Sequence, residues 1–443
     1  MKKTFSRNTS RRDFVKGTSL MAGGILAAPL LSRANFFSGA DDTIKIAVVG
    51  CGGRGTGAAM QALSCKQNVK IVAMADAFKD NLDNCHKSLT DEINNSIGEL
   101  AKRLDVPEER RFTGFDGYQK AIALADVVIL ATPPGFRPIH FAEAIKQGKH
   151  VFMEKPVATD PAGIQSVLAT AAIAKEKKLN VVVGLQRHYQ NSYRELYKRK
   201  DMIGDITSAQ AWWDNDGVWV RPRKYNQTEM EYQMRNWYYF NWLCGDHITE
   251  QHIHNLDVIN WFKGGHPIKA QGFGGRQVRK GKDHGEIFDH HFVEFEYADG
   301  SILNSQCRHI PGTMSKVDEL LIGTKGKIFC GAAHIKDHSG KIIYQYDTKL
   351  ENNPYQSEHD ELFAAIAKGE YKFADAENGA SSTMTSIMGR MATYSGQIIE
   401  WDKAINSGID IHPKKYDWNA EPPVMPNADG YYPIAIPGVT KYF

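Results

Sequence analysis

The chain is poor in cysteine and carries no large excess of charge of either sign. Its six cysteines are scattered through 443 residues, and no two of them form a C-x-x-C pair. That spacing indicates neither a zinc site nor a disulfide framework. The formal net charge is only +3 with histidine counted as neutral. A balance of this kind indicates neither a nucleic acid nor an anionic surface as a partner.

Long apolar runs and internal repeats are also missing. Beyond the first forty residues no apolar run reaches the length of a transmembrane helix, and no segment of the sequence recurs. Hydrophobic residues make up 42% of the chain and charged residues 24%, as in ordinary globular proteins. A chain of this length is expected to fold as two domains.

The first forty residues are typical of an export signal. Two arginines, Arg11 and Arg12, precede a mildly apolar run, rich in glycine and alanine, over residues 17–31. This pattern predicts a twin-arginine signal, recognition by the twin-arginine export machinery, and a periplasmic or otherwise exported protein. Cleavage is expected near Ala34. A disordered basic leader and a retained membrane anchor are the alternatives.

The strongest motif begins at residue 44. An apolar run over residues 44–49 predicts a buried parallel strand, and it leads directly into G-x-G-x-x-G at Gly50, Gly52 and Gly55. In such a motif the first glycine permits a tight turn, the second lets the backbone approach a pyrophosphate, and the third lets helix and strand pack closely. The helix expected next would offer free N–H groups to the phosphates. A glycine-rich turn without a ligand is the alternative.

A carboxylate follows where ribose binding requires one. The next apolar strand, expected at 70–75, ends in Asp76, which lies 21 residues after Gly55. Asp76 can accept hydrogen bonds from ribose hydroxyls and would repel a 2′-phosphate, so the sequence favours NAD over NADP. An exported enzyme meets no soluble NAD pool. We therefore expect the cofactor to be held tightly and recycled within one active site.

Strands and helices go on alternating to about residue 188. Strands are expected at 111–112, 125–130, 149–153 and 180–185, and helices at 117–124, 138–147 and 160–176. This alternation predicts an α/β Rossmann domain with a doubly wound parallel sheet, in which ligands lie beyond the carboxyl ends of the strands. Thr132 and Pro133 follow one such strand and are expected beside the nicotinamide ribose.

Four motifs, in their order and spacing, resemble the Gfo/Idh/MocA family (glucose-fructose oxidoreductase, inositol dehydrogenase, rhizopine catabolism). They are the glycine-rich turn at 50–55, Asp76, Ala131-Thr132-Pro133 and Glu154-Lys155-Pro156, and the resemblance covers roughly residues 43–400. It implies that Lys155 lies beside nicotinamide and substrate and supports proton and hydride transfer. A lysine there can stabilise a developing alkoxide. A surface lysine in a turn is the alternative.

The cofactor site expected from these motifs is larger than the glycine-rich turn. Its residues are Gly50, Gly52, Gly53, Arg54, Gly55, Asp76, Thr132, Pro133, Glu154 and Lys155.

The pattern changes after about residue 190, where strand signals dominate. Strands are expected at 206–213, 268–278, 291–297 and 301–307, and a further hairpin at 320–329. Helices are expected at 358–368 and 380–405, with a kink at Ser395-Gly396. This predicts an α+β domain with an open, mostly antiparallel sheet that carries helices on one face. The other face is expected to join subunits into a dimer or tetramer, as in the family.

These patterns divide the chain into four parts. We expect a signal and linker at 1–40, an NAD-binding Rossmann domain at 42–188, a substrate-binding and oligomerisation domain at 189–410, and a tail at 411–443. The tail is rich in Pro, Gly and Tyr, and it is expected to wrap a surface or a neighbouring subunit.

Acids and histidines alternate in the middle of the second half. On one continuous helix Asp246, Glu250, His254 and Asp257 would share a stripe. By resemblance His254 is the general base on the substrate hydroxyl, and Glu250 positions the substrate or tunes His254. A neutral imidazole suits that role near neutral pH. Glu250 stands where the family usually has Asp and His252 where it usually has Gly, so both are expected to add bulk near the sugar.

A metal site is an alternative interpretation of the same stretch. Asp246, His247, Glu250, His252 and His254 are all ligand types, but no short zinc signature is present, and we expect no metal. Structural histidines at a polar helix end are the other alternative.

Four residues are predicted to contact the substrate. Arg187 and His188 follow the last Rossmann strand and are expected to face the pocket, or else to form a hinge between the domains. Trp213 belongs to an aromatic group that can stack on sugar faces or pack in the core. Asp257 completes the set.

The sequence as a whole predicts an exported, NAD-dependent oxidoreductase. It would transfer hydride between tightly bound NAD and a hydroxyl of a sugar, glycoside or polyol, giving a keto-sugar, with Lys155, His254 and Glu250 as catalytic residues. The first alternative is an NAD-dependent glycoside hydrolase that uses transient oxidation and elimination. The second is a non-catalytic sugar-binding protein that holds NAD.

Overall fold

The computed structural model describes residues 43–95 and 99–442. The expected signal, with Arg11, Arg12 and Ala34, lies outside the described residues, so export remains a prediction. In the described ranges no helix is both long enough and apolar enough to cross a membrane.

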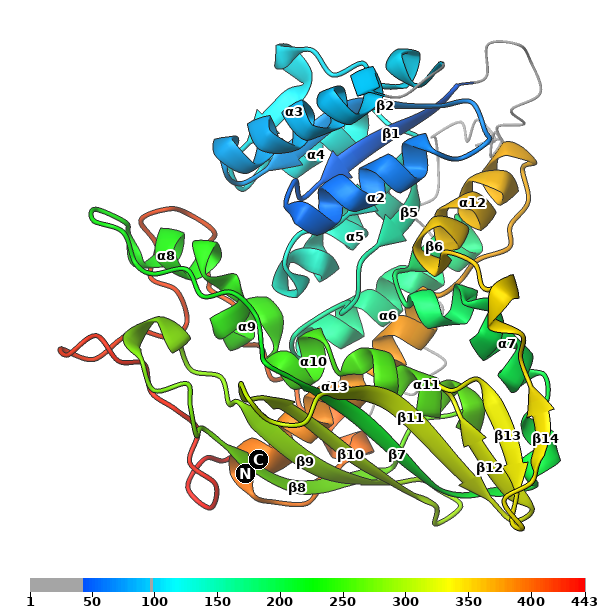
Figure 1. The fold of residues 1–443 in the computed structure, drawn as a ribbon. Helices are drawn as coiled ribbons and strands as arrows, with labels where there is room; N and C mark the ends of the chain where they lie inside the picture. The colour runs from blue at the N-terminus through cyan, green and yellow to red at the C-terminus, as the bar shows by residue number, and fades with distance from the viewer. Residues whose placement is uncertain (1–42, 96–98, 443) are drawn as a thin grey trace, which may run out of the picture. The chain divides into compact units, whose positions relative to one another are not determined.

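The first sheet has six parallel strands in the order β3-β2-β1-β4-β5-β6. Figure 1 shows its strands β1 and β2 side by side. The strands are β1 (Ile44–Val49), β2 (Val69–Asp76), β3 (Arg111–Thr113), β4 (Val127–Leu130), β5 (His150–Met153) and β6 (Val181–Val183). Their central strands are almost wholly apolar because both faces of a parallel sheet are covered. The order reverses between β1 and β4, which is where doubly wound sheets bind ligands. The expected parallel sheet is confirmed.

Helices cover both faces of this sheet. They are α2 (Gly53–Leu63), α3 (Lys79–Asn95), α4 (Gly117–Ala123), α5 (Arg137–Lys146), α6 (Pro161–Glu176) and, from the second half of the chain, α12 (Pro354–Ala367). Alternate residues of β1 pack into hydrophobic cores on opposite faces of the sheet. Ile46 belongs to the core that includes α2, α3 and α12. Ala47 belongs to the core that includes α4, α5 and α6. Asp160 caps α6, and its Oδ1 accepts the Gly163 N–H at 2.7 Å.

The second sheet has nine strands in the order β14-β13-β12-β11-β7-β10-β9-β8-β15. The strands are β7 (Ile206–Asn215), β8 (Lys269–Gly275), β9 (His290–Glu296), β10 (Ile302–His309), β11 (Lys316–Gly323), β12 (Gly326–Phe329), β13 (His334–Asp337), β14 (Ile342–Gln345) and β15 (Ile399–Glu400). Only the pair β7–β10 is parallel. The expected open, mostly antiparallel sheet is therefore confirmed.

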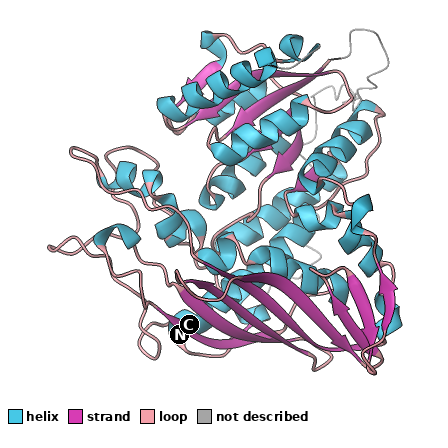
Figure 2. Ribbon diagram, in the orientation of Figure 1, coloured by secondary structure: helices cyan, strands magenta, loops and turns pink. Residues whose placement is uncertain are grey.

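One face of the second sheet carries helices (Figure 2). α11 (Ile253–Lys263) and α13 (Ala376–Ser395) pack on it. α10 (His247–Glu250) reaches it through His247, whose ring stacks on His309 of β10 with centroids 4.5 Å apart. The opposite face includes Phe273, which is 67% exposed and stacks on Phe292 with ring centroids 5.2 Å apart. The dimer or tetramer expected through this sheet remains a prediction.

Short helices complete the second half. They are α7 (Asn191–Tyr197), α8 (Glu229–Arg235), α9 (Asn241–Cys244) and α14 (Trp401–Ile405). The expected helix over 380–405 is not continuous. Gly396 adopts a left-handed conformation, with φ 69°, and ends α13 as a helix cap. β15 separates α13 from α14.

A second expected helix is also interrupted. The stretch from 246 to 261 forms α10 and α11, and Gln251, with φ −114° and ψ −48°, ends α10. Asp246 precedes α10 with φ 69°. The four expected stripe residues therefore do not share one helix face.

The C-terminal tail packs on its own chain. The ring of Trp418 lies 5.1 Å from Phe78 and 4.6 Å from Phe115, both residues of the first half. Tyr432 packs edge-on against Phe240, with centroids 4.9 Å apart. The tail thus contacts side chains from both halves of the chain.

Candidate active site

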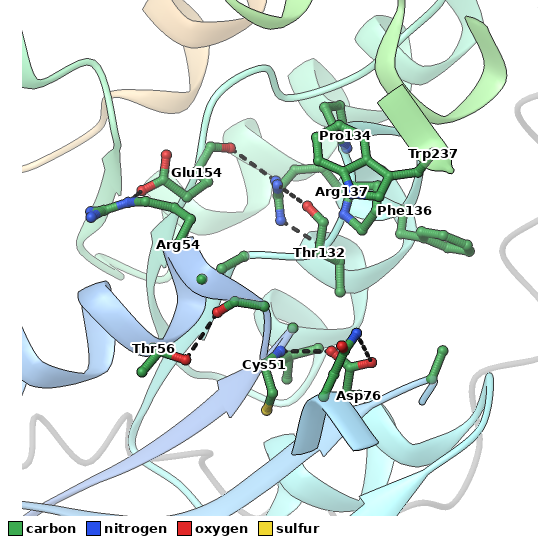
Figure 3. Close-up of a pocket in the computed structure, with 18 of the residues that line it drawn as sticks. Cys51, Arg54, Thr56, Asp76, Thr132, Pro134, Phe136, Arg137, Glu154 and Trp237 are labelled. Carbon is green, nitrogen blue, oxygen red and sulfur yellow. Dashed lines mark hydrogen bonds and ion pairs between the residues drawn. The ribbon is translucent and has the colours of Figure 1, made fainter. Parts of the chain in front are cut away.

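A cavity of about 830 Å³ lies beyond the carboxyl ends of the first sheet's central strands. Its wall from the first half includes the glycine-rich turn and Asp76, and Figure 3 shows how these lie opposite Thr132 and Glu154. Trp213, Glu250, Gln251 and His254 complete it from the second half. Two groups of predicted residues, far apart in the sequence, thus share one cavity.

Two of the three glycines of the motif have a steric reason, Gly50 and Gly55. Gly50 has φ 96°, and a Cβ there would lie 2.4 Å from the Thr132 nitrogen. A Cβ at Gly55 would lie 1.8 Å from the Gly50 oxygen, so only glycine allows this approach of helix to strand. Gly52 differs, because a Cβ there would meet nothing within 4 Å. The open space beside it, at the start of α2, suits a pyrophosphate.

Asp76 ends β2 at the cavity wall. Its Oδ2 accepts the Cys51 N–H at 2.7 Å (Figure 3). Its Oδ1 accepts the Phe78 N–H at 2.9 Å. These bonds fix the carboxylate in the position where ribose hydroxyls can donate to it. The wall residues that α3 adds are uncharged: Asn81, Asn84, Cys85 and Ser88. A 2′-phosphate would meet a carboxylate there and no cation from α3, which favours NAD.

Replacing Asp76 by Asn should weaken NAD binding and reduce the discrimination against NADP. A hydrogen bond to a charged group contributes about 1.5–3 kcal/mol, so we expect the Kd of NAD to rise roughly 10- to 100-fold. Loss of the negative charge should improve NADP binding. Calorimetric titration of nucleotide-free protein with both cofactors measures this. Asp80→Asn is the control, because Asp80 pairs with Arg235 outside the cavity wall. Equal weakening for both cofactors would contradict the assignment.

Arg137 connects the ends of two strands. It is 1% exposed, and its guanidinium donates to the Leu130, Thr132 and Glu154 carbonyl oxygens at 2.8, 2.6 and 2.9 Å. Burial lowers its pKa to about 10, so it stays cationic at neutral pH. This contact holds the Thr132 turn and the Glu154-Lys155 backbone in register beside the cavity. Nothing in the sequence pattern singled out Arg137.

Arg54 and Glu154, both predicted to bind the cofactor, form an ion pair at the cavity wall. Arg54 Nη2 also lies 3.5 Å from Glu358 on α12. Gly184 makes room for the acid, because a Cβ there would come within 2.8 Å of the Glu154 carboxylate. The pair therefore depends on three separate segments of the chain.

Lys155 joins the two halves of the site. Its Nζ donates to the backbone oxygen of Glu250 at 2.6 Å and to the Glu250 carboxylate at 3.3 Å. Burial raises the pKa of Glu250, and the Lys155 charge opposes that rise. The ammonium group is thus held at the cavity wall by two oxygens of the last residue of α10.

His254 lies in the same wall and stacks on Trp213, with ring centroids 5.9 Å apart. Its Nδ1 is buried and has no hydrogen-bond partner among the described residues. Burial, followed by the charges of Lys155 and Arg187, lowers its pKa well below the usual value of about 6.5. The ring is therefore neutral at neutral pH and able to accept a proton.

Arg187, His188 and Asp257 do not line this cavity. Arg187 pairs with the buried carboxylate of Glu319. His188 Nε2 lies 2.8 Å from Asp257 Oδ2, and Asp257 Oδ1 accepts from Ser382 at 2.8 Å. The expectation that these three residues face the pocket is not met, because each is tied to a polar partner behind the wall.

His252 also differs from expectation. It is fully buried, and its Nε2 lies 2.7 Å from the Ser305 hydroxyl on β10. The break at Gln251 turns it toward the sheet, so it adds no bulk to the cavity wall. Of the two residues that depart from the family pattern, Glu250 lines the cavity and His252 does not.

The residues that could hold a metal ion differ from the set considered in the sequence, because His291 joins Asp246 and His247. Ligand atoms of Asp246, His247 and His291 lie within 4.8 Å of one another. The Asp246 carboxylate, however, already accepts the Tyr394 hydroxyl at 2.6 Å, and Arg279 Nη1 is 3.5 Å from His247 Nδ1. A guanidinium at that distance opposes a second cation, so the group fits a buried hydrogen-bond network better than a metal site.

The sequence missed much of the cavity wall. The unpredicted residues include Phe78, Phe115, Phe136, Arg137, Trp219, Arg221, Met234, Gln251 and Tyr355. Most of them come from loops or helix ends, where no periodic pattern reports the direction of a side chain.

Fold and site together define an NAD-binding oxidoreductase. The sequence model of the Gfo/Idh/MocA family, described as an oxidoreductase family with an NAD-binding Rossmann fold, matches residues 44–185. The Rossmann half of the chain matches this family, and NAD is the cofactor that the match supports.

Known relatives extend the similarity beyond the matched segment. The chain is 23% identical to inositol 2-dehydrogenase of Cereibacter sphaeroides over 78% of this chain and 92% of that protein. It is 30% identical to a glycosyl hydrolase family 109 protein of Solibacter usitatus over 34% of this chain and 33% of that protein. Two other curated relatives are matched over only 43% and 61% of their length.

A solved structure shares the fold. It is scyllo-inositol dehydrogenase from Lactobacillus casei with bound NAD(H) and scyllo-inositol, with a TM-score of 0.60 at 21% identity. The alignment covers 81% of this chain and 99% of that one.

Proposed function

We propose that the protein oxidises a hydroxyl group of a sugar, glycoside or polyol to a ketone, with His254 as the base and Lys155 as the group that stabilises the alkoxide. One observation carries the proposal: Lys155 and His254, which lie 99 residues apart in the sequence, line the same cavity as the NAD-binding turn. A base, a cation and a dinucleotide site in one cavity are the parts that alcohol oxidation requires.

The neutral ring of His254 would remove the hydroxyl proton. The Lys155 ammonium, held by the two oxygens of Glu250, would stabilise the negative charge left on the substrate oxygen. NAD⁺, when bound, supplies the hydride acceptor. The burial that keeps His254 neutral also strengthens its interaction with Lys155 and with the developing charge.

A carbohydrate or polyol is the substrate class that the cavity favours. Trp213, Trp219 and Trp237 all line it, and flat rings suit sugar faces. Trp219 and Trp237 pack edge to face, with centroids 5.8 Å apart. The names of two similar proteins, an inositol 2-dehydrogenase and a scyllo-inositol dehydrogenase, agree with a cyclic polyol.

Tight retention of NAD belongs to the same proposal. Phe78 and Phe115 line the cavity, and Trp418 of the tail packs behind both. Movement of this wall during cofactor exchange would disturb the aromatic contacts of the tail. Slow exchange would suit an exported enzyme. Export by the twin-arginine route is part of the proposal, and the Arg11-Arg12 pair with the apolar run over residues 17–31 supports it.

Glycoside hydrolysis is the second candidate. The 30% identity to a glycosyl hydrolase family 109 protein favours it. Oxidation of one hydroxyl makes the neighbouring C–H more acidic, which allows the leaving group to be eliminated and water to add before the ketone is reduced again. The same base and cation would serve both reactions, and the net redox change would be nil.

Released nucleotide and product analysis separate these functions. The purified protein is denatured to identify the released nucleotide. The native protein is then incubated with myo-inositol, scyllo-inositol, free aldoses and aryl glycosides. A reduced-nicotinamide signal with a ketone product supports the oxidoreductase, and free sugar without net reduction supports the hydrolase. Binding without either product would leave only the non-catalytic alternative, and release of no NAD would overturn all three.

A further inference from the structure

Gln251 presents an amide to the cavity from the point where the helix is broken. It lines the wall between Glu250, whose oxygens hold Lys155, and the turn that leads to His254. Its φ of −114° and ψ of −48° end α10, so its side chain does not follow the helix face that a continuous helix would give it. No role for Gln251 follows from the sequence motifs.

Two buried residues fix which way this amide points. Arg279 Nη2 lies 2.7 Å from His309 Nδ1, and His309 Nε2 lies 2.8 Å from Gln251 Oε1. A guanidinium can only donate, so His309 Nδ1 must be the acceptor. The proton of the neutral ring is then on Nε2, which donates to the oxygen of Gln251. These two hydrogen bonds therefore allow only one orientation of the Gln251 amide, with Oε1 toward His309.

The two supports are themselves rigid. Arg279 and His309 are 3% and 2% exposed. The Arg279 guanidinium also donates to the Phe288 backbone oxygen. The backbone N–H of Arg279 donates to Asp289 Oδ2 at 3.0 Å. Burial keeps the pKa of His309 far below its usual value, so the ring does not gain a second proton that would compete with this order.

The amide nitrogen of Gln251 is the last group in this series of hydrogen bonds from Arg279 through His309. No described residue accepts a hydrogen bond from it, and it is not among the enclosed polar atoms without a partner, so it faces the cavity. Its two N–H groups are fixed donors for an oxygen of whatever occupies the cavity. The amide cannot turn round to present its oxygen to the cavity without losing the bond from His309.

We propose that Gln251 is a substrate-positioning residue that donates a hydrogen bond to an oxygen beside the reacting hydroxyl, with Arg279 and His309 fixing the direction of the donor. The inference rests on the proposed function, because His254 and Lys155 are taken as the partners of the reacting hydroxyl. It narrows the substrate to a compound with a second acceptor oxygen next to the oxidised carbon, such as a polyhydroxylated ring, and disfavours an isolated secondary alcohol.

Gln251→Glu is the sharpest test. It keeps the acceptor that His309 needs and nearly the same shape, but at neutral pH it removes both donors. The KM of the panel's best substrate should rise about 10- to 100-fold, with a smaller change in kcat. Activity should recover as the pH falls, because a protonated carboxyl group can donate again. Gln306→Glu is the matched control, since Gln306 lies on the same strand as His309 but faces away from the helices.

Substrate analogues identify the oxygen. The wild-type protein should discriminate strongly between the best substrate and one of its monodeoxy analogues, and Gln251→Leu should lose most of that discrimination. His309→Phe should give an intermediate KM with the same pH profile as wild type. If Gln251→Glu does not fold, as judged by melting and NAD content, the Leu variant with the analogues still tests the donor.

The outcomes separate the two proposals. Unchanged KM, pH profile and deoxy-analogue discrimination in both Gln251 variants would overturn the role of Gln251 and leave the proposed function standing. If Lys155→Met loses turnover while the Gln251 variants keep the wild-type KM and pH profile, the role of Gln251 is overturned and the proposed function stands. No turnover and no binding of any panel compound by the wild-type, NAD-loaded protein would overturn both.

Discussion

Lys155→Met should remove most of the turnover while NAD stays bound. Methionine matches the length of lysine but lacks the ammonium group that would stabilise the alkoxide. Removal of one preorganised electrostatic contact of this kind lowers kcat by about 10²- to 10³-fold. The loss should fall on kcat and kcat/KM alike, because the charge on the substrate oxygen develops only during the reaction. Single-turnover measurement of nicotinamide reduction tests this directly.

The control for that experiment is Lys146→Met, since Lys146 is an exposed lysine at the end of α5 that pairs with Glu143 outside the cavity wall. NAD content after denaturation should equal that of wild type in both variants. Glu250 loses its cation in Lys155→Met, so its pKa should rise further. Full activity in Lys155→Met would favour the non-catalytic alternative, in which Lys155 has no chemical task.

The Rossmann half could be predicted because its signals are local. An apolar strand, a glycine triplet and an acid at the end of the next strand each report a geometry that the same few residues create. A Cβ at Gly55 would collide with the Gly50 oxygen in the same turn, and a Cβ at Gly50 would collide with Ala131 and Thr132 at the end of the neighbouring strand. The Glu154-Lys155 motif behaves in the same way, because it sits at a strand end whose position the sheet fixes.

The second half of the site could be predicted only in part. Glu250 and His254 line the cavity as their spacing suggests, but the continuous helix behind that expectation does not exist. Periodicity assumes unbroken helical dihedral angles. The helix is interrupted at Gln251 and His252, so the side chains of α11 do not continue the register of α10. His252 and Asp257 therefore face polar partners in the protein interior.

Residues that act through tertiary contacts left no signal in the sequence. Arg137 receives its task from three carbonyl oxygens at two strand ends. Gln251 receives its direction from His309 and Arg279, which lie on other segments of the chain. Neither the residue type nor the spacing of these residues distinguishes them from ordinary polar positions. Only the assembled fold shows what they contact.

His254→Asn should lower the rate of substrate oxidation by about 10²- to 10⁴-fold at neutral pH, the usual contribution of a general base. Asparagine keeps a polar group of similar size but cannot accept the proton. The residual rate should rise with pH, because hydroxide takes over the role of the base. His338→Asn is the matched control, since His338 is exposed in the turn after β13. Rates across the pH range, with NAD content and melting as checks, measure the effect.

The pH profile of the wild type gives this prediction its sharpest form. His254 acts as a base only when neutral, and it is neutral above its pKa, which burial and the charges of Lys155 and Arg187 hold well below the usual value. The acid limb of kcat/KM should therefore lie well below pH 6.5. Lys155→Met should move that limb upward, because it removes the largest charge that opposes protonation of His254. An acid limb at or above pH 6.5 in the wild type, or one that Lys155→Met leaves in place, would mean that another group takes the proton.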